Sequence, residues 1–168
     1  ASNNTAVGYD ALFANTTGDG NVAVGVQALG ANTTSAGNTA LGYGAARTTT
    51  TGASNTAVGY LSLKQNTTGH SNVSVGFTAL QENTTGANNT SVGFQSGLAN
   101  TTGSSNTSLG HNSLISNTTA SLNTAVGRSA LQANITGAEN TATGYNSQRD
   151  TTTGNYNTSN GSGSLAVN

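Results

Sequence analysis

Apolar and polar positions recur along the chain with a period of seventeen residues. From Val7, every seventeenth position is Val or Leu in eight repeats, and the position that begins with Leu12 is Leu in seven repeats. Steps of seventeen from Asn4 and from Gly8 reach ten asparagines and ten glycines, without insertion or deletion. We call each such set of positions a column and name it after its member in the first repeat. An unbroken period predicts one repeat array over residues 1–168 and no separate domains. The repeats begin at Asn4, Asn21, Asn38, Asn55, Asn72, Asn89, Asn106, Asn123, Asn140 and Asn157.

A seventeen-residue repeat predicts β structure. It is too short for the helix pairs of common helical repeats, and its Gly, Asn, Thr and Ser residues are poor helix formers. Residues 5–9 are short and partly β-branched, which is typical of a strand, and we expect a second strand around Ala11 and Leu12. The pattern therefore predicts an all-β parallel β-solenoid of ten rungs. Stacking at about 4.8 Å per rung gives a rod of roughly 48 Å.

The two faces of the first strand carry different residue types. Asn4, Ala6 and Gly8 alternate with Thr5, Val7 and Tyr9, so small residues fill one face and larger residues the other. Neither set varies freely, although one face of a lone roll should meet water. We therefore expect the small-residue face to pack on another copy of the chain. The residues of this predicted oligomer face are Ala6, Ala23, Ala40, Ala57, Ala125 and Ala142.

Composition excludes several classes of partner. Asn, Thr, Ser and Gly make up 57% of the 168 residues, and four basic and five acidic side chains leave a net charge of −1. A nucleic-acid binder or an anionic-membrane binder would carry a basic surface, so neither is expected. No apolar stretch approaches transmembrane length, so membrane insertion is not expected. The chain does not begin with Met and has no signal-peptide pattern, which suggests a processed product or a segment of a longer protein.

The sequence offers no constellation for catalysis. Cysteine is absent, and His70 and His111 stand in different columns more than two rungs apart. The acidic residues are scattered, and the Asp column of calcium-binding β-rolls is missing. We therefore expect no enzyme activity, no catalytic residue, no metal site and no cofactor.

Aromatic residues share the Tyr9 column. They could form a ladder that stabilises neighbouring rungs, or a platform on which sugar rings stack, and we favour the ladder because aromatic pairs are common between strands. The proposed ladder residues are Tyr9, Tyr43, Tyr60, Phe77, Phe94 and Tyr145.

Members of the Asn15 column begin Asn-x-Thr acceptor patterns for N-glycosylation. Thr49 and Thr151 replace asparagine in this column, whereas the Asn4 column never changes. A buried ladder should resist that exchange, so we expect the Asn15 column to be exposed and the Asn4 column to hydrogen-bond internally. The candidate glycosylation sites are Asn15, Asn32, Asn66, Asn83, Asn100, Asn117 and Asn134, although a structural ladder is the simpler interpretation.

The motif Asn-Thr-Ala-Val-Gly-Tyr-x-Ala-Leu at residues 4–12 and 55–63 resembles the head repeats of trimeric autotransporter adhesins and related repeats of phage tail fibres. The resemblance covers all ten rungs. It implies a left-handed β-roll that trimerises on a cell or virion surface. The period of seventeen is longer than is typical of adhesin heads, and no neck, stalk or anchor motif is present.

Together these features predict a non-catalytic structural or adhesive segment of an extracellular fibre. We expect a homo-oligomer, with a trimer favoured, that could stack end to end into filaments and bind a carbohydrate or another cell-surface ligand. Two alternatives stay open. The chain could be an ice-binding protein that uses Asn15 and Thr17 as a regular array, or a glycan-coated fibril protein that assembles with itself.

Overall fold

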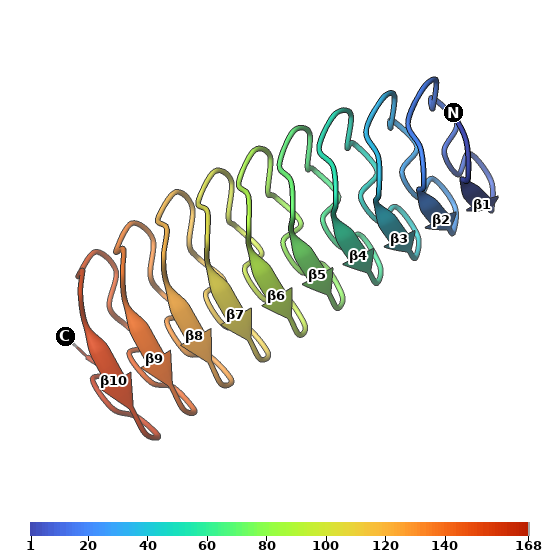
Figure 1. The fold of residues 1–168 in the computed structure, drawn as a ribbon. Coiled ribbons are helices and arrows are strands. Elements are labelled where there is room, and N and C mark those ends of the chain that lie inside the picture. The colour runs from blue at the N-terminus through green and yellow to red at the C-terminus, as the bar shows by residue number, and fades with distance from the viewer. Residues whose placement is uncertain (168) are drawn as a thin grey trace.

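A computed structural model describes residues 1–167, which form an all-β solenoid with one rung per seventeen-residue repeat (Figure 1). Within these residues there are ten three-residue strands, all in one sheet. They are β1 (Thr5–Val7), β2 (Val22–Val24), β3 (Thr39–Leu41), β4 (Thr56–Val58), β5 (Val73–Val75), β6 (Thr90–Val92), β7 (Thr107–Leu109), β8 (Thr124–Val126), β9 (Thr141–Thr143) and β10 (Thr158–Asn160). The predicted parallel β-solenoid is confirmed.

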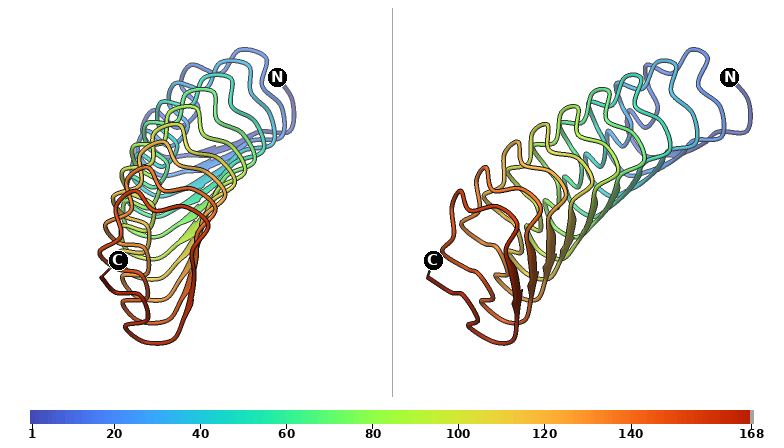
Figure 2. Two further views of the ribbon diagram at one scale, coloured as in Figure 1. Left: turned by 90° about the vertical axis from the view of Figure 1, so that its left-hand side faces the viewer. Right: turned by 60° about the vertical axis from the view of Figure 1, so that its left-hand side comes forward.

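The strands follow one another in sequence order and pair in parallel. Thr5 pairs with Val22 and Ala6 with Ala23, and the same seventeen-residue offset holds through β10. The strands lie along one side of a gradually twisting rod, with the two ends of the described chain at opposite ends of the rod (Figure 2). Equivalent residues of the ten repeats are therefore stacked above one another, as the unbroken period requires.

Each strand is followed by a glycine that no other residue can replace without strain. In the Gly8 column φ lies between +123° and +139°, a conformation that L-residues rarely adopt. A Cβ atom on Gly110 would lie 2.6 Å from the carbonyl oxygen of Gly127 in the next rung. The close approach of successive backbones explains why this column is invariant.

The second predicted strand is absent, and the prediction was wrong. Asp10 (φ 56°) and Leu12 (φ 53°) are in the left-handed region, so residues 9–14 form a compact turn. This turn still bonds from rung to rung, since the N–H of Leu12 donates to the carbonyl oxygen of Ala28 (3.1 Å). Turn-prone Gly and Asn residues between the segments favoured a second strand here, but the left-handed residues bend the chain where a strand would be extended.

The interior is narrow and filled by small residues and leucines. Ala23, Ala40 and Ala57 are fully buried, and so are most leucines of the Leu12 column. The buried apolar residues form two clusters, one reaching Leu80 and the other beginning at Leu114. Between them the interior is polar, with buried serines in place of alanines and Gly97 in the leucine column. Residues 1–167 include no helix that is long and apolar enough to cross a membrane.

Candidate functional site

Two asparagine columns meet at one main-chain carbonyl inside seven of the described rungs. In the second rung, Nδ2 of Asn21 and Nδ2 of Asn32 both donate to the carbonyl oxygen of Ser35, at 2.9 and 3.2 Å. Equivalent bonds to the equivalent carbonyl recur along the rod. This arrangement holds the turn around Ser35 to the start of the strand, so amide side chains close each of these seven rungs.

The same two columns also connect neighbouring rungs. The N–H of Asn21 donates to Oδ1 of Asn4 (2.8 Å), and this bond repeats at every step through Asn157. In the second column, Nδ2 of Asn32 donates to Oδ1 of Asn15 (2.9 Å). The internal hydrogen-bonding role predicted for the Asn4 column is confirmed.

The predicted exposure of the Asn15 column was wrong. Asn15 is partly buried because it lies in the first rung, and the other members have at most 2% of their surface exposed: Asn32, Asn66, Asn83, Asn100, Asn117 and Asn134. Their Nδ2 atoms, to which a glycan would be attached, point inward and donate to protein oxygens. The exposure on which the glycosylation hypothesis rested is therefore absent.

The predicted oligomer face was also wrong. Ala23, Ala40, Ala57, Ala125 and Ala142 are fully buried inside their own chain, and only Ala6, in the first rung, is exposed. The interior of a seventeen-residue coil is too narrow for valine beside the leucine column, so the small face turns inward. The alanine column is the core of each rung and is not available to a partner.

The opposite face of the sheet is apolar and exposed. It consists of the Thr5, Val7 and Tyr9 columns, and we call it the outer face. Leu41 is 48% exposed and Val92 is 38% exposed, and the aromatic side chains are exposed by between 43% and 72%. Of the nine Lys, Arg, Asp and Glu residues in the chain, only Arg128 belongs to these columns. The Val7 and Tyr9 columns thus give the outer face an apolar, almost uncharged strip over the first eight rungs, and Thr143 and Asn160 replace the aliphatic residue in the last two.

Part of the predicted aromatic ladder forms a continuous stack. Successive ring centroids from Tyr43 through Tyr60, Phe77 and Phe94 are 5.2–5.4 Å apart, with interplanar angles of 7–13°. His111, which was not predicted as a ladder member, extends the stack at 5.1 Å from Phe94. The ring faces inside this stack cover one another, so a sugar ring could reach only their edges. The geometry favours the structural ladder over the sugar platform.

The two remaining predicted ladder residues lie outside this stack. Tyr9 is separated from Tyr43 by Val26 and is 72% exposed. Tyr145 contacts a cation instead of a ring, because the guanidinium carbon of Arg128 lies 5.7 Å from its ring centroid. Such a cation–π contact extends the ladder by a different interaction.

The threonines next to the buried asparagines have two different environments. Most hydroxyls of the Thr16 column donate to the carbonyl oxygen seventeen residues further on, as Thr67 does to Thr84 (3.0 Å). The Thr17 column is exposed in all nine of its rungs. Because Asn15 points inward and Thr17 outward, the two-column array of the ice-binding hypothesis does not form.

Titratable groups are scattered over the surface. Arg149 and Asp150 form an exposed ion pair (2.7 Å), in which the hydrogen bond from Arg149 lowers the pKa of Asp150. His70 and His111 lie apart, the first near Ser71 and the second in the aromatic stack. Among residues 1–167 no group of three or more His, Cys, Asp or Glu side chains could hold a metal ion.

Comparison with known proteins gives no relative. No family model, no curated protein and no solved structure matches the chain. Function is therefore argued from the rod and its surfaces.

Proposed function

We propose that the chain is a non-catalytic structural segment of an extracellular fibre and that copies of it associate through the outer face. The observation that carries this proposal is the apolar, nearly uncharged strip over the first eight rungs. Parallel sheets are ordinarily covered on both faces, and large exposed apolar patches mark interaction surfaces. The leucine and alanine columns cover the inner face, so the outer face is the one that lacks cover.

A second copy of the chain is the partner that best fits this strip. A partner must offer apolar side chains at the rung spacing of this strip, and a copy has the same rung spacing and the same columns. Association of identical rods also produces closed symmetric oligomers. We favour a trimer on a cell or virion surface, because the head-type repeats that the motif resembles imply that state.

Charge substitution on the outer face tests the proposal. Leu41→Asp and Val92→Asp place carboxylates on the strip, and each should lower the molar mass measured by light scattering at equal concentration. The matched controls are Thr51→Asp and Thr102→Asp, which put the same charge on exposed positions of the same rungs but on another face. Unchanged mass in both outer-face variants, with thermal unfolding intact, would contradict association through this face.

A further inference from the structure

Gly30 is an exception within its column, and the repeating fold does not explain it. The Phe13 column faces outward, and none of its members in the described residues is buried. Nine of its ten members carry side chains, and the exception is Gly30. The backbone does not require glycine there, because φ at Gly30 is outside the left-handed region and the equivalent positions of other rungs carry side chains, although an added Cβ would lie close to the carbonyl oxygen of Gln27 (3.3 Å). The missing side chain therefore reflects something other than backbone geometry.

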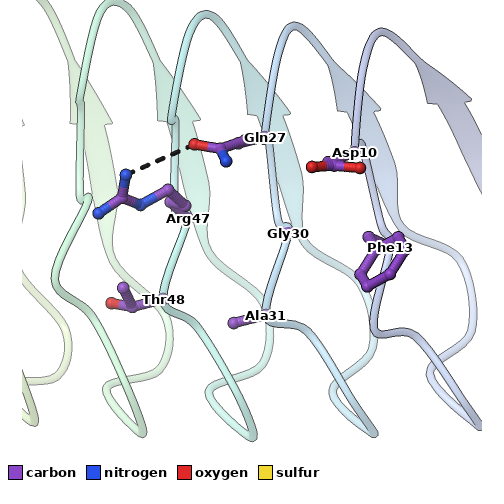
Figure 3. A pocket seen from close by; sticks show the side chains of 7 residues that line it. All are labelled: Asp10, Phe13, Gln27, Gly30, Ala31, Arg47 and Thr48. Atoms are coloured by element: carbon purple, nitrogen blue, oxygen red, sulfur yellow. Dashed lines mark hydrogen bonds between the residues drawn. The ribbon is translucent and has the colours of Figure 1, made fainter.

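The gap at Gly30 is a surface notch of about 250 Å³ (Figure 3). Phe13 stands at one end, in the rung before the gap, and Arg47 stands at the other end, in the rung after it. Asp10 and Gln27 line one long side, and Ala31 and Thr48 line the other. The notch thus has one aromatic wall and a rim of polar groups.

The gap has the thickness of one ring. Phe13 and Arg47 are two rungs apart in the same column, so their Cα atoms are separated by roughly 9.6 Å. In the neighbouring aromatic ladder the same rung spacing places ring centroids 5.1–5.4 Å apart. A ring occupying the empty position at Gly30 would therefore lie at stacking distance from Phe13.

The polar groups indicate what kind of ring fits. Nη1 of Arg47 donates to Oε1 of Gln27 (3.5 Å), and the guanidinium extends along the rod on the side away from Phe13. A ligand would meet one apolar surface, Phe13, which is 78% exposed. At the edges of the ligand, the Asp10 carboxylate would accept hydrogen bonds and the Arg47 guanidinium would donate them. The Gln27 amide could do either. A pyranose combines an apolar C–H face, which would lie on Phe13, with a rim of hydroxyls, which would meet these polar groups.

We propose that this notch binds one uncharged pyranose ring of a glycan, stacked on Phe13. Asp10 and Gln27, on the same long side of the notch, bond to ring hydroxyls, and Arg47 bonds to a hydroxyl at the end opposite Phe13. Asp10 and Arg47 contribute opposite charges, so the notch has no net charge that would select an ionic sugar. This proposal deepens the fibre function and rests on it, because a sugar site on a surface fibre would serve adhesion.

Saturation-transfer NMR with methyl β-glucopyranoside, methyl β-galactopyranoside and methyl α-mannopyranoside tests the site. At least one pyranoside should bind, and Phe13→Ala and Gly30→Gln should each weaken its affinity about tenfold or more, since the first removes the stacking surface and the second fills the gap. Glutamine already occupies this column at Gln81 and Gln132, so Gly30→Gln should keep the fold. Tyr156→Ala, which removes another exposed aromatic residue, should leave binding unchanged.

Three results would overturn the sugar site: no pyranoside binds the wild-type chain, Gly30→Gln binds as tightly as wild type, or leucine binds while no pyranoside does. None of them affects the molar mass measured for the outer-face variants. Failure of the sugar site is thereby distinguishable from failure of the fibre proposal.

Discussion

The side-chain oxygen Oδ1 of Asn134 is buried without a hydrogen-bond donor, because the next rung carries Thr151 where the ladder requires an asparagine. Thr151 Oγ1 is buried without a partner as well. Thr49 interrupts the same column earlier in the chain, yet there the hydroxyl of Ser35 donates to Oδ1 of Asn32. Gly137 occupies the position equivalent to Ser35 and cannot supply that bond.

Thr151→Asn should therefore stabilise the protein. The new Nδ2 group would donate to Asn134 Oδ1, as asparagines do in other rungs, and should raise the free energy of unfolding by about 1 kcal/mol. Urea titration followed by circular dichroism at fixed protein concentration measures it. Ser35→Gly is the converse variant and should lose stability, because it leaves Asn32 Oδ1 without its donor. A destabilised Thr151→Asn variant would contradict this account of the ladder.

Gln148→Leu should also stabilise the chain. Gln148 is fully buried in the leucine column, and neither Oε1 nor Nε2 has a partner. Its backbone (φ 51°) matches that of Leu131 (φ 50°) in the preceding rung, so leucine should fit without rearrangement. Removing the buried, unpaired amide should raise the free energy of unfolding by about 2 kcal/mol. A shift of the urea denaturation midpoint to higher concentration measures it. No gain in stability would indicate that the amide is satisfied by water.

Asn83→Ala tests the asparagine ladder directly. Nδ2 of Asn83 donates to Asn66 Oδ1 (3.0 Å) and to the carbonyl oxygen of Gly86 (3.0 Å), and its own Oδ1 accepts from Asn100 (2.8 Å). Removing these bonds leaves several buried groups unpaired and should cost about 3 kcal/mol. Thr85→Ala in the same rung changes an exposed side chain and should alter stability by less than about 0.5 kcal/mol. Equal effects of the two substitutions would refute the ladder.

The sequence was sufficient for the architecture but not for the orientation of its faces. An unbroken period required stacked rungs, and the invariant Asn4 column indicated an internal ladder. Alternation showed that Ala6 and Val7 face opposite ways, but it could not show which face is inside. The narrow interior decides that, and it admits alanine in preference to valine.

Substitution in a column was a poor guide to exposure. Thr49 and Thr151 suggested that the Asn15 column faces solvent, yet a hydroxyl can replace part of the amide's bonding. Nδ2 of Asn66 donates to Oγ1 of Thr49 (3.4 Å), and Ser35 supplies the missing donor beside Asn32. The sequence did not predict the notch at Gly30. A single glycine in a variable column does not indicate a binding site until the surrounding side chains are placed in space.

Stability should depend little on pH. The buried polar side chains of residues 1–167 are Asn, Gln, Ser and Thr, which do not titrate in the ordinary range. The hydrogen bond from Arg149 lowers the pKa of Asp150, so this exposed pair stabilises the fold above the unfolded carboxyl's pKa of 3.8 and loses that effect as the pH falls. The melting temperature should be nearly constant from about pH 5 to 9 and fall slightly below about pH 4. A steep change near neutral pH would contradict the non-titrating core.

Sedimentation equilibrium of the wild-type chain most directly tests the claim that its uncovered outer face joins copies of the same rod. The chain has a mass of 16.5 kDa, and the account predicts an oligomer, with three times this mass for the favoured trimer. A species of 16.5 kDa that persists at all protein concentrations, with the β-sheet circular dichroism of the folded rod, would contradict it.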